Sequence, residues 1–265
     1  MKKKKIKILI IGKRSFISRN YLKFSRIKKK IEVINYKSIS KINFKNYSHV
    51  FNLSLDPNVK LKNLNHTNKL DQKICNSIKN KNIIYILPST RFVYKKKFKK
   101  NEKKNLVYKK NKIEIEKIVK KIKKPNFLIL RIGNILAYDL KNKSLFITKA
   151  LNDLKKKKVI KIDLYKNTYK DFMTFEYFSK CLDKMIEKNI VGTYNFSSGI
   201  KVNIDLICKS LIQGYGKGRI IYEKKLKKDS FVLNNDKLKK IIKVRLNKKD
   251  ILNYCHRLGK KLKNA

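Results

Sequence analysis

A tyrosine and a lysine four residues apart, Tyr108 and Lys112, are the first residues in the chain whose types and spacing could do chemistry. Apolar residues recur at helical intervals over residues 107–122, and on a helix two residues four apart lie on one face. A phenol has an ordinary pKa of about 10, and a neighbouring ammonium lowers it by favouring the phenolate. The pair is therefore a candidate for general acid–base catalysis.

Lysine is so abundant that this spacing alone is weak evidence. The chain of 265 residues has 63 lysines, 8 arginines and 18 Asp+Glu, which gives a formal net charge of +53. The simplest explanation is drift in an A/T-rich genome, because the lysines run from Lys2 to Lys263 and arginine, which makes bidentate contacts with bases, is rare. We expect weak, salt-sensitive binding of polyanions but no specific nucleic-acid partner.

The cysteines and histidines lack the spacing of metal ligands, and no C-x-x-C pair occurs. We expect reduced, buried thiols and no metal site. These residues are Cys75, Cys181, Cys208, Cys255, His49, His66 and His256.

The elements that must position the Tyr/Lys pair alternate between short apolar runs and amphipathic stretches. Strands are expected at residues 6–11, 31–34, 49–53, 83–87 and 127–132, and helices at 16–24 and 107–122. This alternation predicts an α/β fold with a Rossmann-type, doubly wound parallel sheet. Beyond about residue 140 helices dominate, at 178–186 and 204–212, with a strand at 219–222. We expect a Rossmann domain over 1–165, with strand and helix contributions from later residues, and a smaller C-terminal α/β portion over 166–265.

No stretch reaches the length of a membrane span, which is about 18 apolar residues or more. The lysine-led run that ends at residue 11 is too short for a signal peptide. We expect a cytoplasmic protein without membrane contact.

The first strand runs into a glycine, Gly12, and a helix follows. A strand, a tight turn and a helix N-terminus aimed at a pyrophosphate are the context of a dinucleotide-binding turn. Asn35, after the second strand, stands where an acidic residue often holds the adenosine ribose. An amide still bonds a hydroxyl but removes the charge that repels a 2′-phosphate, so NAD and NADP both remain open.

These residues resemble the NAD(P)-dependent epimerase/dehydratase family, the extended short-chain dehydrogenases/reductases. Their fingerprint is G-x-x-G-F-I-G, which Gly12, Phe16 and Ile17 match, while Ser15 and Ser18 replace glycines. The resemblance implies that a set of residues in this turn and later in the chain borders the cofactor: Gly12, Ser15, Phe16, Ile17, Ser18, Asn35, Leu53 and Lys112.

The likeness continues collinearly along the chain. Residues 89–94, S-T-R-F-V-Y, resemble a segment of dTDP-dehydrorhamnose reductases, which implies that Thr90, or Ser89 as the fallback, bonds the substrate oxygen beside Tyr108. Lys112 is then the residue that tunes Tyr108 and holds the nicotinamide ribose. Asn134 in L-R-I-G-N and Lys170 in K-D-F-M-T-F-E match substrate-contacting positions.

The resemblance implies an epimerase, dehydratase or reductase that acts on a nucleotide sugar with NAD or NADP, and a possible homodimer through the Tyr/Lys helix. Two alternatives stay open. The glycine replacements at 15 and 18 fit a member of the family that binds nucleotide without turnover. The lysine surface fits a polyanion-binding protein.

Overall fold

The computed structural model describes residues 6–66, 69–79, 82–97, 102–121, 127–140, 145–227 and 229–265. The chain folds into two compact units. The first unit comprises residues 1–132 and 179–196, and the second comprises 133–178 and 197–265. This division differs from the expected one at residue 165, which stays a prediction about domains.

The first unit contains a six-stranded parallel sheet in the order β2-β1-β3-β4-β5-β9. The expected Rossmann-type, doubly wound sheet is thereby confirmed. Its strands are β1 (Ile8–Ile11), β2 (Ile31–Ile34), β3 (His49–Asn52), β4 (Ile84–Thr90), β5 (Phe127–Ile132) and β9 (Gly192–Phe196). The helices are α1 (Phe16–Phe24), α2 (Leu70–Ile78), α3 (Lys103–Lys120) and α5 (Phe175–Glu187), of which the first turn belongs to the second unit.

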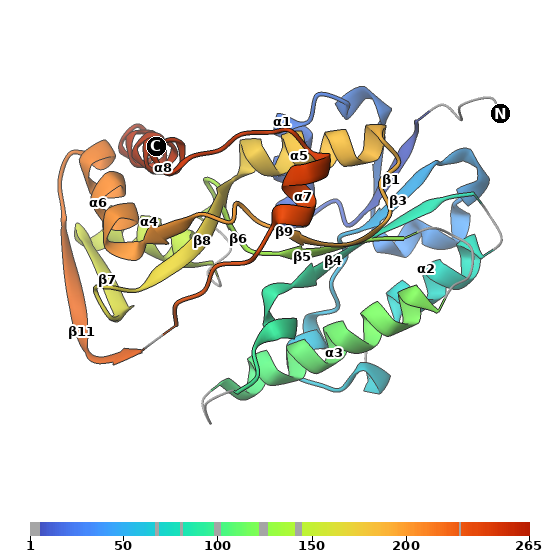
Figure 1. Cartoon of the computed structure of the whole chain (residues 1–265), viewed down its shortest axis with the longest axis horizontal. Helices are drawn as coiled ribbons and strands as arrows, with labels where there is room; N and C mark the ends of the chain where they lie inside the picture. The colour runs from blue at the N-terminus through green and yellow to red at the C-terminus, as the bar shows by residue number, and fades with distance from the viewer. Residues whose placement is uncertain are drawn as a thin grey trace. The chain divides into compact units, whose positions relative to one another are not determined.

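Both faces of this sheet are covered, α1 and α5 lying on one side and α2 and α3 on the other (Figure 1). Side chains alternate between the two faces of a strand, so Leu9 and Ile11 of β1 pack with Ile74 of α2 and Ile115 of α3. On the α1 side, the buried Asp183 of α5 accepts hydrogen bonds from the side chain of Tyr21 and the backbone of Arg26. The packed helices thus hold the strands in place, and with them the positions of the strand ends.

One buried histidine gives the first unit a pH-dependent stability. His49 of β3 is 1% exposed, and its Nε2 has no hydrogen-bond partner in the described part of the chain. Burial lowers the pKa of His49 from 6.5 to about 4. The unfolded state therefore binds a proton that the folded state refuses, so the free energy of unfolding falls as the pH drops from 6.5 towards 4.

Lowering the pH from 7 to 5 is expected to remove about 2 kcal/mol through this residue. The measurement is urea denaturation of the wild type and His49→Gln at both pH values, because the difference between the two slopes isolates His49 from every carboxylate. Parallel pH dependences in the two proteins would contradict the expectation.

The second unit has two small sheets, ordered β10-β8-β6 and β11-β7. β8 pairs in parallel with β6 and antiparallel with β10. The strands are β6 (Asn134–Leu136), β7 (Val159–Leu164), β8 (Tyr169–Thr174), β10 (Lys201–Asn203) and β11 (Arg219–Lys227). The helices are α4 (Phe146–Lys157), α6 (Ile204–Tyr215), α7 (Asp236–Ile241) and α8 (Lys248–Lys263).

Helices α6 and α8 approach each other at two glycines. A Cβ on Gly214 would collide with the carbonyl oxygen of His256, and a Cβ on Gly259 with that of Leu211. Each helix therefore presents bare backbone to the other, and the core of the unit closes around Cys208, Leu211 and Cys255. Among the helices of the described residues, none combines the length and apolar character of a membrane span.

Candidate functional site

The turn after β1 requires glycine. Gly12 has a φ of +116°, in the left-handed region that L side chains rarely adopt. A Cβ there would lie 2.8 Å from both the carbonyl carbon of Leu53 and the backbone nitrogen of Ser54. The Gly12 amide also donates to the carbonyl oxygen of Ile34 at 2.9 Å. The carboxyl ends of β1, β2 and β3 therefore meet closely around this one residue.

The two serines that replace the fingerprint glycines preserve the turn. Ser15 is the N-cap of α1, and its Oγ accepts a hydrogen bond from the Ser18 amide at 2.9 Å. Because the oxygen accepts there, the Ser15 hydroxyl keeps its own proton to donate. Ser18 is fully buried, and its Oγ has no partner among the described residues. The start of α1 keeps the anion-binding character of a helix N-terminus.

A hollow of about 490 Å³ opens at this turn. Four of the expected cofactor residues line it, namely Gly12, Ser15, Asn35 and Leu53, whereas Phe16, Ile17 and Ser18 do not. Sequence reasoning missed the other residues that line it, which are Lys13, Arg14, Tyr36, Lys37, Ser54 and Leu55. The helix N-terminus, the hydroxyl of Ser15 and the cationic side chains in this lining fit the phosphates of a dinucleotide.

The Tyr/Lys pair lies on α3, as expected. Lys112 is 3% exposed, and its Nζ donates to the carbonyl oxygen of Pro88 at 2.8 Å. The same Nζ lies 5.8 Å from the ring centroid of Tyr108, and the Nζ of Lys60 lies 5.4 Å from it. Both distances are within cation–π range. Tyr108 is half-buried, and its hydroxyl makes no hydrogen bond to a described residue. The hydroxyl is therefore available to a ligand.

Thr90 ends β4 two residues after the carbonyl that holds Lys112. Its Oγ1 accepts from the Phe92 amide at 3.3 Å and so caps a short 3-10 turn, Arg91–Tyr94. The hydroxyl proton is still available as a donor. Ser89, the fallback for the same role, instead donates to Glu116 Oε1 at 2.6 Å in a buried contact. The contacts therefore favour Thr90 over Ser89.

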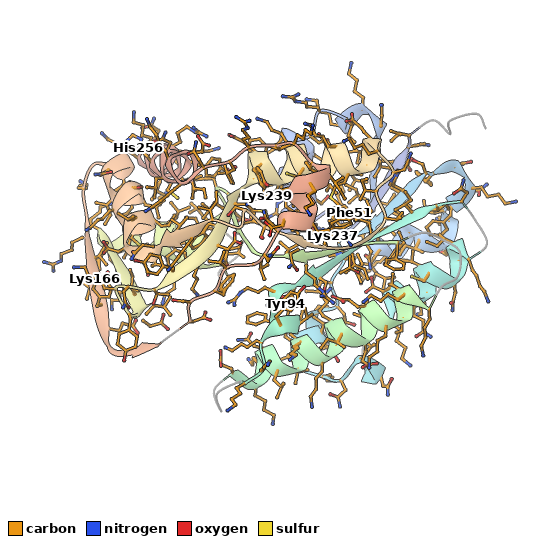
Figure 2. The ribbon with its side chains drawn as sticks, viewed as in Figure 1. Phe51, Tyr94, Lys166, Lys237, Lys239 and His256 are labelled. Atoms are coloured by element: carbon orange, nitrogen blue, oxygen red, sulfur yellow. The ribbon has the colours of Figure 1, made fainter. Side chains whose placement is uncertain are left out.

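Glu116 anchors a polar network beneath this strand end. Arg131 of β5 binds it through two nitrogens, at 3.1 and 2.6 Å. Burial raises the pKa of the Glu116 carboxyl, but the hydrogen bonds from Arg131 and Ser89 outweigh it and leave that pKa lowered. The network continues from Arg131 to the Tyr94 hydroxyl at 2.7 Å, and Tyr94 lies beside α3 (Figure 2).

The sequence did not predict this network, although it contains both Glu116 and the L-R-I-G-N segment that carries Arg131. It ties together the carboxyl ends of β4, β5 and β9, since Tyr94 also donates to Asn195 at 2.7 Å. It thereby fixes the strand end that carries Thr90 against the helix that carries Tyr108.

The two expected substrate residues belong to the second unit. Asn134 of β6 donates through its side-chain amide to the carbonyl oxygen of Asp171 at 2.9 Å, which links β6 to β8. Lys170 of β8 pairs with Asp229 at 2.6 Å, and its Nζ also lies 5.9 Å from the ring centroid of Phe231. Its charge is therefore partly compensated within the unit.

Metal and thiol chemistry find no support in the described residues. No group of three His, Cys, Asp or Glu side chains there could hold a metal ion. The four cysteines are all buried. Burial raises the pKa of Cys75, Cys208 and Cys255, so these thiols are poor nucleophiles.

No protein-family model matches the sequence, and neither does any curated protein. Solved structures match it over nearly its full length. UDP-N-acetylglucosamine 4-epimerase from Bacillus cereus has a TM-score of 0.77 at 14% identity, covering 98% of each chain. UDP-glucuronic acid 4-epimerase from the same organism, in complex with UDP-glucuronic acid and NAD, has a TM-score of 0.72 at 15% identity, covering 97% of this chain and 100% of that one.

An NAD-dependent NDP-hexosamine 5,6-dehydratase, TunA, has a TM-score of 0.77 at 11% identity and covers 98% of this chain and 100% of its own. The chain shares the α/β fold of these epimerases and this dehydratase, with a Rossmann-like six-stranded parallel sheet and smaller C-terminal sheets. The expected resemblance to this class of fold is confirmed. The finer similarity to dTDP-dehydrorhamnose reductases stays a prediction, because the structures compared are epimerases and a dehydratase. Open α/β sheets bind ligands outside the carboxyl ends of their strands, where Gly12, Asn35 and Thr90 lie.

Proposed function

We propose that the chain is an NAD(P)-dependent epimerase, dehydratase or reductase that acts on a nucleotide sugar. One observation above all supports the proposal. The buried ammonium of Lys112 donates to the carbonyl oxygen of Pro88, which lies in β4 two residues before Thr90. The same ammonium lies 5.8 Å from the ring centroid of Tyr108. A hollow lined by Gly12, Ser15 and Asn35 opens along the same edge of the sheet.

The order of the strands sets how a dinucleotide would lie. Asn35 follows β2, Gly12 follows β1, Leu53 follows β3 and Thr90 ends β4, and these four strands are consecutive neighbours in the sheet. Neighbouring strands are about 4.8 Å apart, so the three steps span about 14 Å. An extended dinucleotide would run with its adenosine at β2, its pyrophosphate at the helix N-terminus after Gly12, and its reacting ring near β4.

When bound, the cofactor supplies the hydride acceptor or donor. Tyr108 is the general acid–base, which takes a proton from, or returns one to, a sugar hydroxyl or carbonyl oxygen through its unengaged hydroxyl. The Thr90 hydroxyl donates a hydrogen bond to that oxygen and orients it. Lys112 lies beside the Tyr108 ring, and its remaining protons are available to a ribose hydroxyl.

The second unit completes the proposal. Asn134 and Lys170 would contact the nucleotide sugar, Lys170 through its charge, and the portion from 166 onward would act as the substrate-binding part. A homodimer through α3 is retained as a prediction, although the exposed lysines of that helix oppose it by like-charge repulsion: Lys103, Lys104, Lys110, Lys117 and Lys120. A cytoplasmic location also stays a prediction.

Dinucleotide binding is the first test. Fluorescence titration with NADH and NADPH is expected to show binding of one or both, and Gly12→Ala is expected to weaken it at least tenfold, about 1.4 kcal/mol, because the new Cβ meets the backbone of residues 53 and 54. The matched control is Gly216→Ala, since Gly216 also has a positive φ, +92°, but its Cβ would meet only the Lys263 Nζ at 3.8 Å.

Failure of both cofactors to bind the folded wild type would overturn the proposal. Equal loss of affinity in Gly12→Ala and Gly216→Ala would show that the turn has no special part in binding. Circular dichroism of both variants shows that each remains folded.

A further inference from the structure

The hollow beside Gly12 is lined by cations and by no carboxylate. Lys13 and Arg14 follow the glycine, and Lys37 lies across from them after β2. All three side chains are exposed and face solvent. The remaining residues that line the hollow are neutral. A ligand group that sits here meets a positive potential without an acidic residue to offset it.

Asn35 decides the chemistry at the end of β2. Its Oδ1 accepts a hydrogen bond from the Lys37 amide at 3.2 Å and begins a 3-10 turn over Tyr36–Lys41. With the oxygen engaged in this way, the side chain keeps its NH₂ group as a donor. A carboxylate at this place accepts hydrogen bonds from both ribose hydroxyls and repels a phosphate on either. The amide does the reverse, because it can donate to a phosphate oxygen and carries no charge.

We propose that the residues at the ends of β1 and β2 accept the 2′-phosphate of a phosphorylated dinucleotide, so that the chain binds NADP(H) in preference to NAD(H). This inference rests on the proposed function, since it names the cofactor of the same site. Asn35 and Lys37 would contact the phosphate from the β2 side and Arg14 from the β1 side. The epimerase and the dehydratase with the same fold are described with NAD, so the specificity would differ from theirs.

The high lysine content demands probes of equal charge. Titration with NADPH and NADH at 0.1 M salt is expected to give NADPH a dissociation constant at least tenfold lower. Competition with 2′,5′-ADP and 3′,5′-ADP then separates recognition of the phosphate position from general attraction, because the two anions differ only in where one phosphate is attached. We expect 2′,5′-ADP to displace NADPH at a concentration at least fivefold lower.

Three variants test the residues. Asn35→Asp keeps the oxygen that caps the turn but adds the repelling charge, and it is expected to weaken NADPH at least tenfold while NADH is unchanged or tighter. Lys37→Gln is expected to weaken NADPH severalfold and leave NADH within twofold. The control is Lys23→Gln, an exposed lysine of α1 that does not line the hollow, which should leave the NADPH/NADH ratio unchanged.

Each failure has its own signature. Equal or tighter binding of NADH by the wild type would overturn the NADP preference and leave the proposed function standing. Equal competition by the two bisphosphates would overturn the phosphate site, as would a Lys23→Gln effect as large as that of Lys37→Gln. Binding of neither dinucleotide would instead defeat the proposed function itself.

Discussion

Replacing Tyr108 by phenylalanine is expected to lower turnover by about 10²- to 10⁴-fold, the usual contribution of a positioned general acid–base. The hydroxyl is the one group of the Tyr108 side chain that the change removes, and no described residue is hydrogen-bonded to it. Stability and cofactor affinity should therefore stay close to those of the wild type. Turnover is measured by NMR, as the interconversion of a panel of UDP-sugars in the presence of NADH, NADPH or their oxidised forms. Cofactor affinity is measured by fluorescence titration.

Tyr47→Phe is the matched control. It also removes a tyrosine hydroxyl from the first unit, but at the amino ends of the strands instead of their carboxyl ends. Tyr47 precedes β3, and its hydroxyl donates to Glu32 at 2.7 Å. The loss of this half-exposed hydrogen bond is expected to lower stability by about 1 kcal/mol or less and to leave turnover unchanged. Undiminished turnover in Tyr108→Phe would remove Tyr108 from the mechanism.

Replacing Gly259 by alanine is expected to lower the free energy of unfolding of the second unit by about 2 kcal/mol, because overpacking costs up to about 3 kcal/mol and the helix propensity of alanine offsets about 1 kcal/mol. The new Cβ would collide with the carbonyl oxygen of Leu211 and lie 2.8 Å from the Tyr215 nitrogen. These neighbours are backbone atoms that cannot rotate away. Alanine by itself favours a helix by about 1 kcal/mol over glycine, so a net loss isolates the contact.

Thermal and urea denaturation provide the measurement, with Lys260→Ala as the control. Lys260 is the next residue on α8 and its side chain is exposed, so this variant should be within about 0.5 kcal/mol of the wild type. A Gly259→Ala protein as stable as the control would show that α6 and α8 can separate without loss.

Strands β1 to β5 of the first unit could be predicted because buried parallel strands are short, nearly uniform apolar runs, whereas β9 was not expected. The expected 31–34 and 127–132 agree with β2 and β5 to the residue, and 16–24 agrees with α1. Helix α8 was not expected, although Ile251, Tyr254, Cys255, Leu258 and Leu262 recur at helical intervals and are all buried. The spacing of these apolar residues indicates a helix, but the many lysines between them made the apolar stripe hard to recognise.

The candidate site divides in the same way. Gly12, Asn35 and Thr90 could be placed because the end of a parallel strand is a fixed point of the fold. The pairing of Glu116 with Arg131 depends on how α3 packs against β5, which no local pattern specifies. Lys13 and Lys37 carried no positional information, since lysine occurs throughout this chain.

The interleaving of the two units has a consequence for how the protein is made. Synthesis proceeds from the N-terminus, so β5 emerges from the ribosome before the whole of the second unit and well before β9. Until residue 196 has been added, Leu128, Ile129 and Leu130 belong to an edge strand that is paired with β4 on one side only, and an open edge of this kind recruits other chains. The last strand of the first sheet is therefore the nascent chain's protection against aggregation, and we expect a protein truncated at residue 165 to be insoluble.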